Sequence, residues 1–259
     1  MIEWPTSIKY DPVNTEAEFK VLWQQTSGSP LSRAVQAGIR ADRLSWVFIA
    51  GYQSAVRLAF DKIPGNEWWS FAVSEDQSGQ LSGVTIQDKK LSGTKTWVAA
   101  CDNVDGVIVT AAGKCFLLPR SRHGVVFKCY AESRFLPDMS TGKVTLNNTE
   151  SGQAAEMNMD FRLAEPLALM AASAGYLWRE GSRLESKMLR DGAQSVVERM
   201  HDLDTTEANT IGPLYASVAD LGKHCGKIAV ENEDSSQADW RQNGRLLSLY
   251  RKSFSEHTN

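Results

Sequence analysis

The spacing of hydrophobic residues changes twice along the chain. In the first stretch, apolar residues such as Leu44, Val47 and Phe48 recur at separations typical of an amphipathic helix. The middle stretch alternates apolar and polar residues, and helical spacing then returns until the end of the chain. These patterns predict an α+β protein in three parts: an N-terminal helical segment (1–66), a middle antiparallel β-barrel or sandwich domain (67–160) and a C-terminal helical bundle (161–259).

The N-terminal part contains two helical patterns. Thr15 is of a residue type that caps helices, and Glu18, three residues later, completes a capping box for a short helix. A longer pattern runs over residues 31–60, and Gly51 lies within it. Glycine inside a helix costs about 1 kcal/mol relative to alanine. Gly51 therefore indicates close packing against another element.

The middle part consists of short apolar runs, for example at 107–109 and 125–127, and of alternating stretches around Val84 and Thr94. Glycine, aspartate, asparagine and serine separate these runs at intervals of roughly ten residues. Such regular spacing is typical of antiparallel strands in a sandwich or barrel. The strictly alternating strands are expected to have one solvated face.

The C-terminal part begins with a stretch at 167–177 that is apolar on almost every side, which predicts a deeply buried helix. Glycine and proline at 210–213 predict a break before a further helix at 214–230. The acidic, polar residues 231–237 predict a mobile loop. A basic helix at 240–254 is predicted to close the chain.

Composition and charge exclude several classes of protein. The 259 residues are 42% hydrophobic and 23% charged, which is ordinary for a globular protein with a sizeable core. A net charge of −3 and the lack of a basic cluster give no reason to expect a nucleic-acid partner. The N-terminus does not resemble a signal peptide, and no apolar run approaches the ~20 residues that span a bilayer.

The cysteines are far apart in the sequence and form no C-x-x-C motif, so neither a zinc site nor a redox motif is predicted. We expect small, buried, reduced thiols and a cytoplasmic protein. The four are Cys101, Cys115, Cys129 and Cys225.

Two motifs in the middle part carry the most information about function. The first, V-S-E-D-Q-S-G at 73–79, follows an apolar strand, and the second, S-G-T-K-T-W-V-A-A at 92–100, ends a hairpin. They resemble the motifs T-E-P-x-A-G-S-D and N-G-x-K-x-W-I-T-N of the acyl-CoA dehydrogenase family. The helix–strand–helix order of the chain is similar to that family as well. The identical residues are Glu75, Gly79, Gly93, Lys95 and Trp97.

The resemblance implies a fold and an activity. Members of the family have an N-terminal helical domain, a β-barrel-like middle domain and a C-terminal four-helix bundle, and FAD lies between the last two. A glutamate removes the α-proton of an acyl-CoA thioester, and the flavin takes the β-hydride. The implied protein is an FAD-dependent oxidoreductase that acts on acyl-CoA and forms homo- or hetero-oligomers.

The resemblance also implies which residues bind the cofactor. Ser74 would hydrogen-bond the N5/O4 edge of the flavin, and Trp97 would lie against the ring. Val73, Val98 and Ala99 belong to the same motifs, although Ala99 replaces a hydroxyl residue of the family. A purely structural interpretation makes Trp97 a half-buried strand aromatic and Ser74 a hydroxyl at a strand end.

Glu165 is the candidate catalytic base. Some members of the family place the glutamate ten residues before a glycine in the first long helix of the bundle, and here Glu165 precedes Gly175 by ten. A base of this kind needs a dry pocket that raises the pKa of the carboxyl group. The structural alternative is a helix N-terminal carboxylate favoured by the macrodipole, with Pro166 as the first helical residue.

Departures from the family leave two other interpretations open. Of the R-x-x-F-G segment that grips the FAD pyrophosphate only Arg190 remains, and the late Gly-Gly-x-Gly stretch has no counterpart. The chain could therefore be a catalytically degenerate homologue that acts as a heteromer subunit or as an acyl-CoA or protein binding module. A third interpretation is an unrelated interaction protein. No metal site is predicted from the histidine and two aspartates at 201–204, and the neighbouring His224 and Cys225 point apart on a helix.

Overall fold

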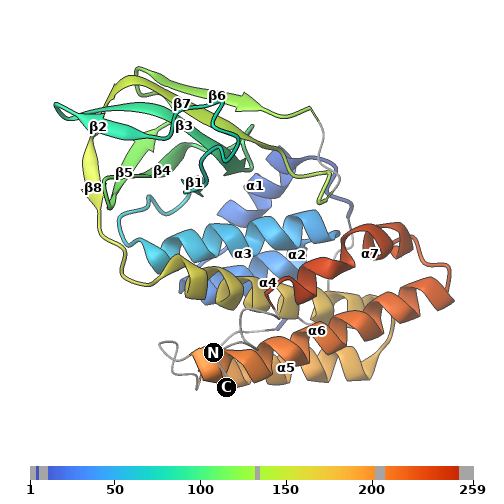
Figure 1. Ribbon diagram of the computed structural model, residues 1–259. Coiled ribbons are helices and arrows are strands. Elements are labelled where there is room, and N and C mark those ends of the chain that lie inside the picture. The colour runs from blue at the N-terminus through green and yellow to red at the C-terminus, as the bar shows by residue number, and fades with distance from the viewer. Residues whose placement is uncertain (1–3, 6–10, 132–134, 202–207, 251–259) are drawn as a thin grey trace. The chain divides into compact units, whose positions relative to one another are not determined.

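The computed structural model describes residues 4–5, 11–131, 135–201 and 208–250 (Figure 1). Helices, then strands, then helices follow one another along the chain, as the hydrophobic spacing predicted. The chain forms two compact units, a helical unit made of residues 1–55 and 162–259 and a β unit made of residues 56–161. Within the described ranges, no helix combines the length and the apolar character needed to cross a bilayer.

The helices of the chain differ widely in length. In chain order they are α1 (Glu16–Gln24), α2 (Pro30–Arg40), α3 (Leu44–Ala59), α4 (Phe161–Arg183), α5 (Lys187–His201), α6 (Ala208–Glu231), α7 (Gln237–Asn243) and the short 3-10 helix η1 (Gly244–Ser248). The last residues of α3 pass into the β unit.

The predicted start of α1 is confirmed. The Thr15 hydroxyl accepts a hydrogen bond from the Glu18 amide at 3.1 Å. The Glu18 carboxylate in turn accepts one from the Asn14 amide at 2.8 Å, one residue earlier than in an ideal capping box. Two backbone donors at the helix start are thereby satisfied.

The single helix predicted over 31–60 is wrong, because the chain breaks into α2 and α3. Ala41 adopts an extended conformation, and the carboxylate of Asp42 accepts a hydrogen bond from the Val13 amide at 2.9 Å. The first amide of α3, on Leu44, donates to the carboxylate of Asp239 at 2.8 Å. A residue far along the chain therefore helps to cap α3, and periodicity alone cannot show such a cap.

Helix α4 is the buried centre of the helical unit, as its apolar sequence predicted. An added Cβ on Gly51 of α3 would lie 2.6 Å from Cα of Leu169, which confirms the close packing expected there. Cβ atoms on Gly38 of α2 and on Gly175 of α4 would overlap the backbone carbonyls of Ala172 and Val35. Helices α2 and α3 thus approach α4 at near-backbone contact, which only glycine allows.

Two predictions for the C-terminal helices are wrong. Pro213 lies inside α6 instead of in a break, because a buried face formed by Ile211, Leu214 and Val218 continues through it. Burial of that face outweighs the single helical hydrogen bond that proline removes. The helix predicted over 240–254 is the short α7 followed by η1 as far as Ser248, and residues after 250 lie outside the described part.

The acidic stretch 231–237 forms the predicted turn between α6 and α7, but one of its carboxylates is held in place. Asp234 accepts two hydrogen bonds from the Arg183 guanidinium, at 2.6 and 2.9 Å. Glu180, which is buried on α4, pairs with the same guanidinium. This cluster ties the turn to α4.

The β unit consists of two four-stranded sheets, which form two layers in Figure 1. Their strand orders are β1-β4-β5-β8 and β2-β3-β7-β6. The strands are β1 (Trp69–Ala72), β2 (Thr85–Gln87), β3 (Lys90–Ala99), β4 (Gly106–Ala111), β5 (Lys114–Pro119), β6 (Val125–Cys129), β7 (Thr141–Glu150) and β8 (Gln153–Ala155).

The predicted sandwich is confirmed, with one difference in pairing. Strands β1 and β4 pair in parallel, whereas the other pairs of the described sheets are antiparallel. The chain leaves β1, forms β2 and β3 in the other sheet and returns to β4. A crossover of this length allows parallel pairing, which a short hairpin cannot produce.

Candidate functional site

The two motifs of the middle part meet at one buried lysine. Lys95 on β3 is 2% exposed, and its ammonium group donates to the Val73 carbonyl at 3.2 Å and to the Thr110 hydroxyl at 3.1 Å. It also forms an ion pair with Glu75 at 2.6 Å. All three donors of the ammonium group are therefore used. The lysine ties β3 both to β4 and to the chain segment that follows β1.

Ser74 and Trp97 lie close together as a result. The Ser74 carbonyl accepts hydrogen bonds from the amide of Thr96 at 2.8 Å and from its hydroxyl at 3.3 Å. Trp97 is the next residue on β3 and is partly exposed. The side chains of Val73 and Ser74 are exposed, and the Ser74 hydroxyl has no protein partner among the described residues.

Glu75 and two glycines complete this cluster. The Lys95 ammonium, by hydrogen bond and by charge, and the Val84 amide lower the pKa of the Glu75 carboxyl. A Cβ on Gly83 would lie 2.5 Å from that carboxylate. Gly93 has a φ of +127°, and its Cβ would overlap the Gly83 carbonyl. The glycine of the second motif therefore brings β3 close to the ion pair.

Val98 and Ala99 occupy a different environment, since both side chains are buried, at 0% and 1% exposure. The Ala99 amide donates to the Ser70 hydroxyl at 3.1 Å within the β unit. Of the five predicted cofactor-binding residues, the structure thus brings Val73, Ser74 and Trp97 to the surface and leaves these two in the core.

Glu165 lies in the second turn of α4, which begins at Phe161. Pro166 is consequently inside the helix, and the alternative in which it is the first helical residue is wrong. The Glu165 side chain is partly exposed, yet burial of its carboxyl group raises the pKa to about 7, against an opposing hydrogen bond from Tyr250. A helix-dipole anchor would have a lowered pKa instead.

Two tyrosines interact with Glu165, and no sequence pattern predicted either of them. The backbone amide of Tyr250 donates a hydrogen bond to the Tyr215 hydroxyl at 3.1 Å. The two rings meet edge to face, with 6.2 Å between their centroids. Burial raises the pKa of Tyr215 to about 12, and burial together with Glu165 raises the pKa of Tyr250 further. Both phenols therefore stay protonated near neutral pH and can act as hydrogen-bond donors.

The other candidates do not form a site. Arg190 on α5 donates to the Gly181 carbonyl at 3.1 Å, so its guanidinium is at least partly engaged. Asp202 and Asp204 lie outside the described residues. Across the part of the chain that the structure describes, no group of three or more His, Cys, Asp and Glu side chains is placed to hold a metal ion.

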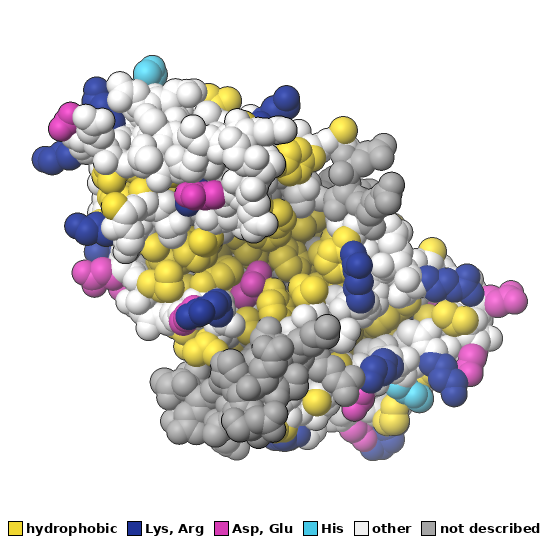
Figure 2. All heavy atoms as spheres, viewed as in Figure 1, with side chains coloured by type: hydrophobic (Ala, Val, Ile, Leu, Met, Phe, Trp, Pro, Cys, Tyr) yellow, Lys and Arg dark blue, Asp and Glu magenta, His cyan; other side chains and the backbone are white. Residues whose placement is uncertain are grey.

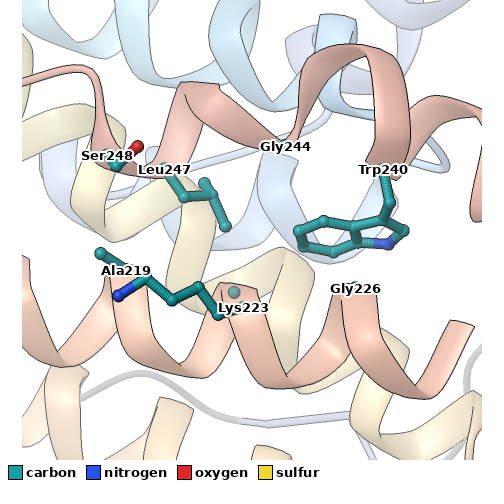
Figure 3. Close-up of a pocket in the computed structure, with 8 residues that line it drawn as sticks. Ala219, Lys223, Gly226, Trp240, Gly244, Leu247 and Ser248 are labelled. Carbon is teal, nitrogen blue, oxygen red and sulfur yellow. The ribbon is translucent and has the colours of Figure 1, made fainter. Parts of the chain in front are cut away.

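Helices α6, α7 and η1 enclose a separate pocket of about 210 Å³ (Figure 3). Trp240 and Leu247 project from one side of it toward Ala219, Lys223 and Gly226 of α6. None of the candidate site residues lines this pocket. On the face shown in Figure 2, basic and acidic side chains are interspersed, which agrees with the small net charge.

Solved structures show what the chain is similar to. It matches the structure of PigA with FAD and proline at a TM-score of 0.68 and 12% identity, over 95% of this chain and 88% of that one. For a structure described as an FAD-dependent dehydrogenase, the TM-score is 0.64 and the identity 10%, over 94% of each chain. The structure of butyryl-CoA dehydrogenase from Megasphaera elsdenii matches at a TM-score of 0.67 and 9% identity, over 94% of this chain and 89% of that one.

Sequence comparison adds nothing to this result, because no family model and no curated protein matches the chain. At identities this low, structural similarity establishes the fold. The chain therefore has the fold of the acyl-CoA dehydrogenases, as its two motifs predicted.

Proposed function

We propose that the protein is an FAD-dependent oxidoreductase that introduces an α,β double bond into an acyl thioester, with acyl-CoA as the substrate. The observation that carries the proposal is the buried Lys95, which holds Ser74 and Trp97 together at the surface of the β unit. The names of the similar structures, which include an FAD-dependent dehydrogenase and butyryl-CoA dehydrogenase, support it.

The exposed end of the β unit fits the edge of a flavin. The Ser74 hydroxyl is exposed and has no protein partner in the described part of the chain, so it can donate to a flavin acceptor. Trp97 offers an aromatic face beside it, and Val73 offers an apolar surface. Val98 and Ala99 support this end from the core and do not line it. Bound FAD would supply the hydride acceptor.

Glu165 is proposed to take the α-proton of the thioester on a carboxylate oxygen. With a pKa of about 7, it is partly ionised near neutral pH and is a stronger base than an exposed glutamate. The hydrogen bond from Tyr250 favours the charged form and fixes the orientation of the carboxylate. Both effects suit a group that must gain a proton and release it again within one catalytic cycle.

The test combines a flavin spectrum with turnover. Purified protein supplied with FAD should show flavin absorbance after gel filtration, and acyl-CoA with a dye acceptor should be oxidised. Glu165→Gln should keep the flavin and lose at least 100-fold in turnover, as expected for removal of a general base. Glu198→Gln, at an exposed position of α5, is the matched control and should keep full turnover.

The same measurements distinguish the proposed oxidoreductase from the alternative, a catalytically degenerate homologue. Its specific support is that Val98 and Ala99 are buried and that only an engaged arginine remains of the pyrophosphate motif. Protein that stays colourless with FAD contradicts the flavin proposal. Protein that binds FAD but oxidises no acyl thioester, alone or with a partner subunit, would favour the binding-module interpretation. The native mass, measured on the same sample, tests the proposed oligomer.

A further inference from the structure

Two cysteines that are distant in the sequence meet in the β unit. Cys101 lies two residues after the end of β3, and Cys129 is the last residue of β6. Their sulfur atoms lie 2.7 Å apart, and both residues are thiols in this structure. The spacing of the cysteines in the sequence did not predict this contact. Sulfur atoms at this separation need only a small movement to form a bond.

Gly142 on β7 makes the approach possible. Cys129 is its partner in the β6–β7 ladder. A Cβ on Gly142 would overlap the Cys101 sulfur and lie 2.8 Å from Cα of Cys129. The space that a side chain of β7 would fill is therefore occupied by sulfur. Any larger residue at 142 would separate the two thiols.

Backbone hydrogen bonds fix both cysteines on either side of β7. The Cys101 amide donates to the Ser140 carbonyl at 3.2 Å, and the Tyr130 amide, next to Cys129, donates to the Thr141 carbonyl at 2.7 Å. The short sulfur contact is therefore built into the sheet, because it does not depend on one flexible side chain.

We propose that Cys101 and Cys129 are a modification site at which peroxide forms a reversible disulfide across β7. The proposal is independent of the flavin and of the acyl thioester, since it requires only the fold of the β unit. The disulfide would affect the exposed end of the β unit that is proposed to bind the flavin. The Tyr130 hydroxyl donates to the Thr96 carbonyl at 2.8 Å, so the bond would clamp the strand segment that carries Trp97.

The chemistry balances with hydrogen peroxide as the oxidant. The Cys129 sulfur, the more exposed of the two, attacks a peroxide oxygen, the O–O bond breaks, and a sulfenic acid and water form. The Cys101 sulfur then attacks the Cys129 sulfur, the S–O bond breaks, and a second water leaves as the disulfide forms. Two electrons pass from the sulfur atoms to peroxide, and both thiol protons end in water.

The surroundings of Cys129 predict that peroxide oxidises its thiol slowly. Burial, and then the Asp102 carboxylate, raise the pKa of the Cys129 thiol, so little thiolate is present at neutral pH. Replacing the exposed Asp102 by asparagine removes the nearby negative charge and should accelerate disulfide formation several-fold. The substitution keeps the backbone amide of residue 102, which donates to the Ser140 hydroxyl at 2.9 Å.

The test is peptide mapping of the full chain after peroxide treatment and alkylation. Trypsin releases Cys101 in peptide 96–114 and Cys129 in peptide 129–134, and these two should be found linked. Cys115 and Cys225 should be alkylated as free thiols, and dithiothreitol should abolish the link. Oxidised protein should melt about 5 °C higher, because the bond closes a chain loop.

Cys129→Ser should remove both the link and the rise in melting temperature, whereas Cys225→Ser should leave both unchanged. Cys129→Ala provides a second variant if the serine disturbs the sheet. The proposal is overturned if peroxide leaves Cys101 and Cys129 alkylatable, or oxidises Cys129 to the sulfinic acid without a link. It is equally overturned if the linked peptides appear only in protein unfolded by urea.

Discussion

Two regions of the molecule, the strand-end cluster around Lys95 in the β unit and the surroundings of Glu165 in the helical unit, treat their carboxyl groups in opposite ways. In the β unit, Glu75 lies beside the Lys95 ammonium, which lowers the pKa of the carboxyl group and keeps it charged. In the helical unit, burial raises the pKa of Glu165 to about 7, against an opposing hydrogen bond from Tyr250. Opposite charge stabilises an ion, whereas loss of water destabilises it.

This difference separates a structural role from a chemical one. Glu75 and Lys95 both match the family motifs, yet their groups are occupied with each other and with the strand ends. They hold Ser74 and Trp97 in position. Glu165 interacts with the phenols of Tyr215 and Tyr250, which stay protonated, and its own protonation can change near neutral pH. The most recognisable residues are thus supports, and the reactive candidate is the less recognisable one.

The largest expected effect comes from the packing around α4 in the helical unit. Gly175→Ala places a Cβ against the Val35 carbonyl, and because this neighbour is backbone, α2 and α4 must move apart. We expect the free energy of unfolding to fall by about 3 kcal/mol. Urea unfolding measures it, with Gly65→Ala as the control, since a Cβ there has no atom within 4 Å. Equal stabilities of the two variants would show that the helices do not meet this closely.

The next effect tests the buried carboxyl group by pH. A pKa raised from 4.5 to about 7 means that folded Glu165 holds its proton more tightly than the unfolded chain does. The free energy of unfolding should therefore fall by about 3 kcal/mol in total as the pH rises from 4.5 through 7. Glutamine mimics the protonated form and escapes this loss. Glu165→Gln should thus match the wild type at pH 5 and be more stable by about 2 kcal/mol at pH 8.

Urea unfolding at pH 5, 6.5 and 8 measures this difference, with Glu198→Gln as the exposed control. The control should follow the wild type at every pH. A wild type whose stability does not decline over this range, relative to Glu165→Gln, would show that the carboxyl group is hydrated.

A smaller loss of stability is expected in the strand-end cluster of the β unit. Lys95→Met keeps a long apolar side chain but removes three contacts of the ammonium group. Since methionine also avoids the cost of burying a charge, the net destabilisation should be about 2 kcal/mol. Flavin binding should weaken at least tenfold, because Val73 and Ser74 lose their anchor. Lys223→Met is the control, as its exposed ion pair with Asp220 contributes little.

The order of elements and the strand-end motifs could be predicted from the sequence because they depend on residues that are neighbours along the chain. Hydrophobic spacing follows directly from which face of a helix or strand is buried. Gly93 and Lys95 contact a chain segment that is only one hairpin away in the sequence. The same reasoning identified Gly51 as a point of close packing.

The errors have a common cause, which is contact between distant segments. Asp239 caps α3, the buried face of α6 continues past Pro213, and the thiols of Cys101 and Cys129 meet over a glycine of a third strand. The environment of Glu165 is of the same kind, since Tyr215 and Tyr250 come from the far end of the chain. No local pattern encodes these neighbours, although they decide the pKa of the carboxyl group.

The smallest change in stability provides the sharpest test of the strand-end cluster. The Ser74 hydroxyl is exposed and makes no hydrogen bond to the described part of the protein, so Ser74→Ala should alter the free energy of unfolding by less than about 0.5 kcal/mol. If that hydroxyl donates to the flavin, FAD binding should weaken about 5-fold, as for the loss of one hydrogen bond. Ser82→Ala, also exposed in the β unit, should change neither quantity. Unchanged FAD affinity in Ser74→Ala, together with a loss in Lys95→Met, would mean that the flavin contacts this end through Trp97 and the backbone rather than through Ser74.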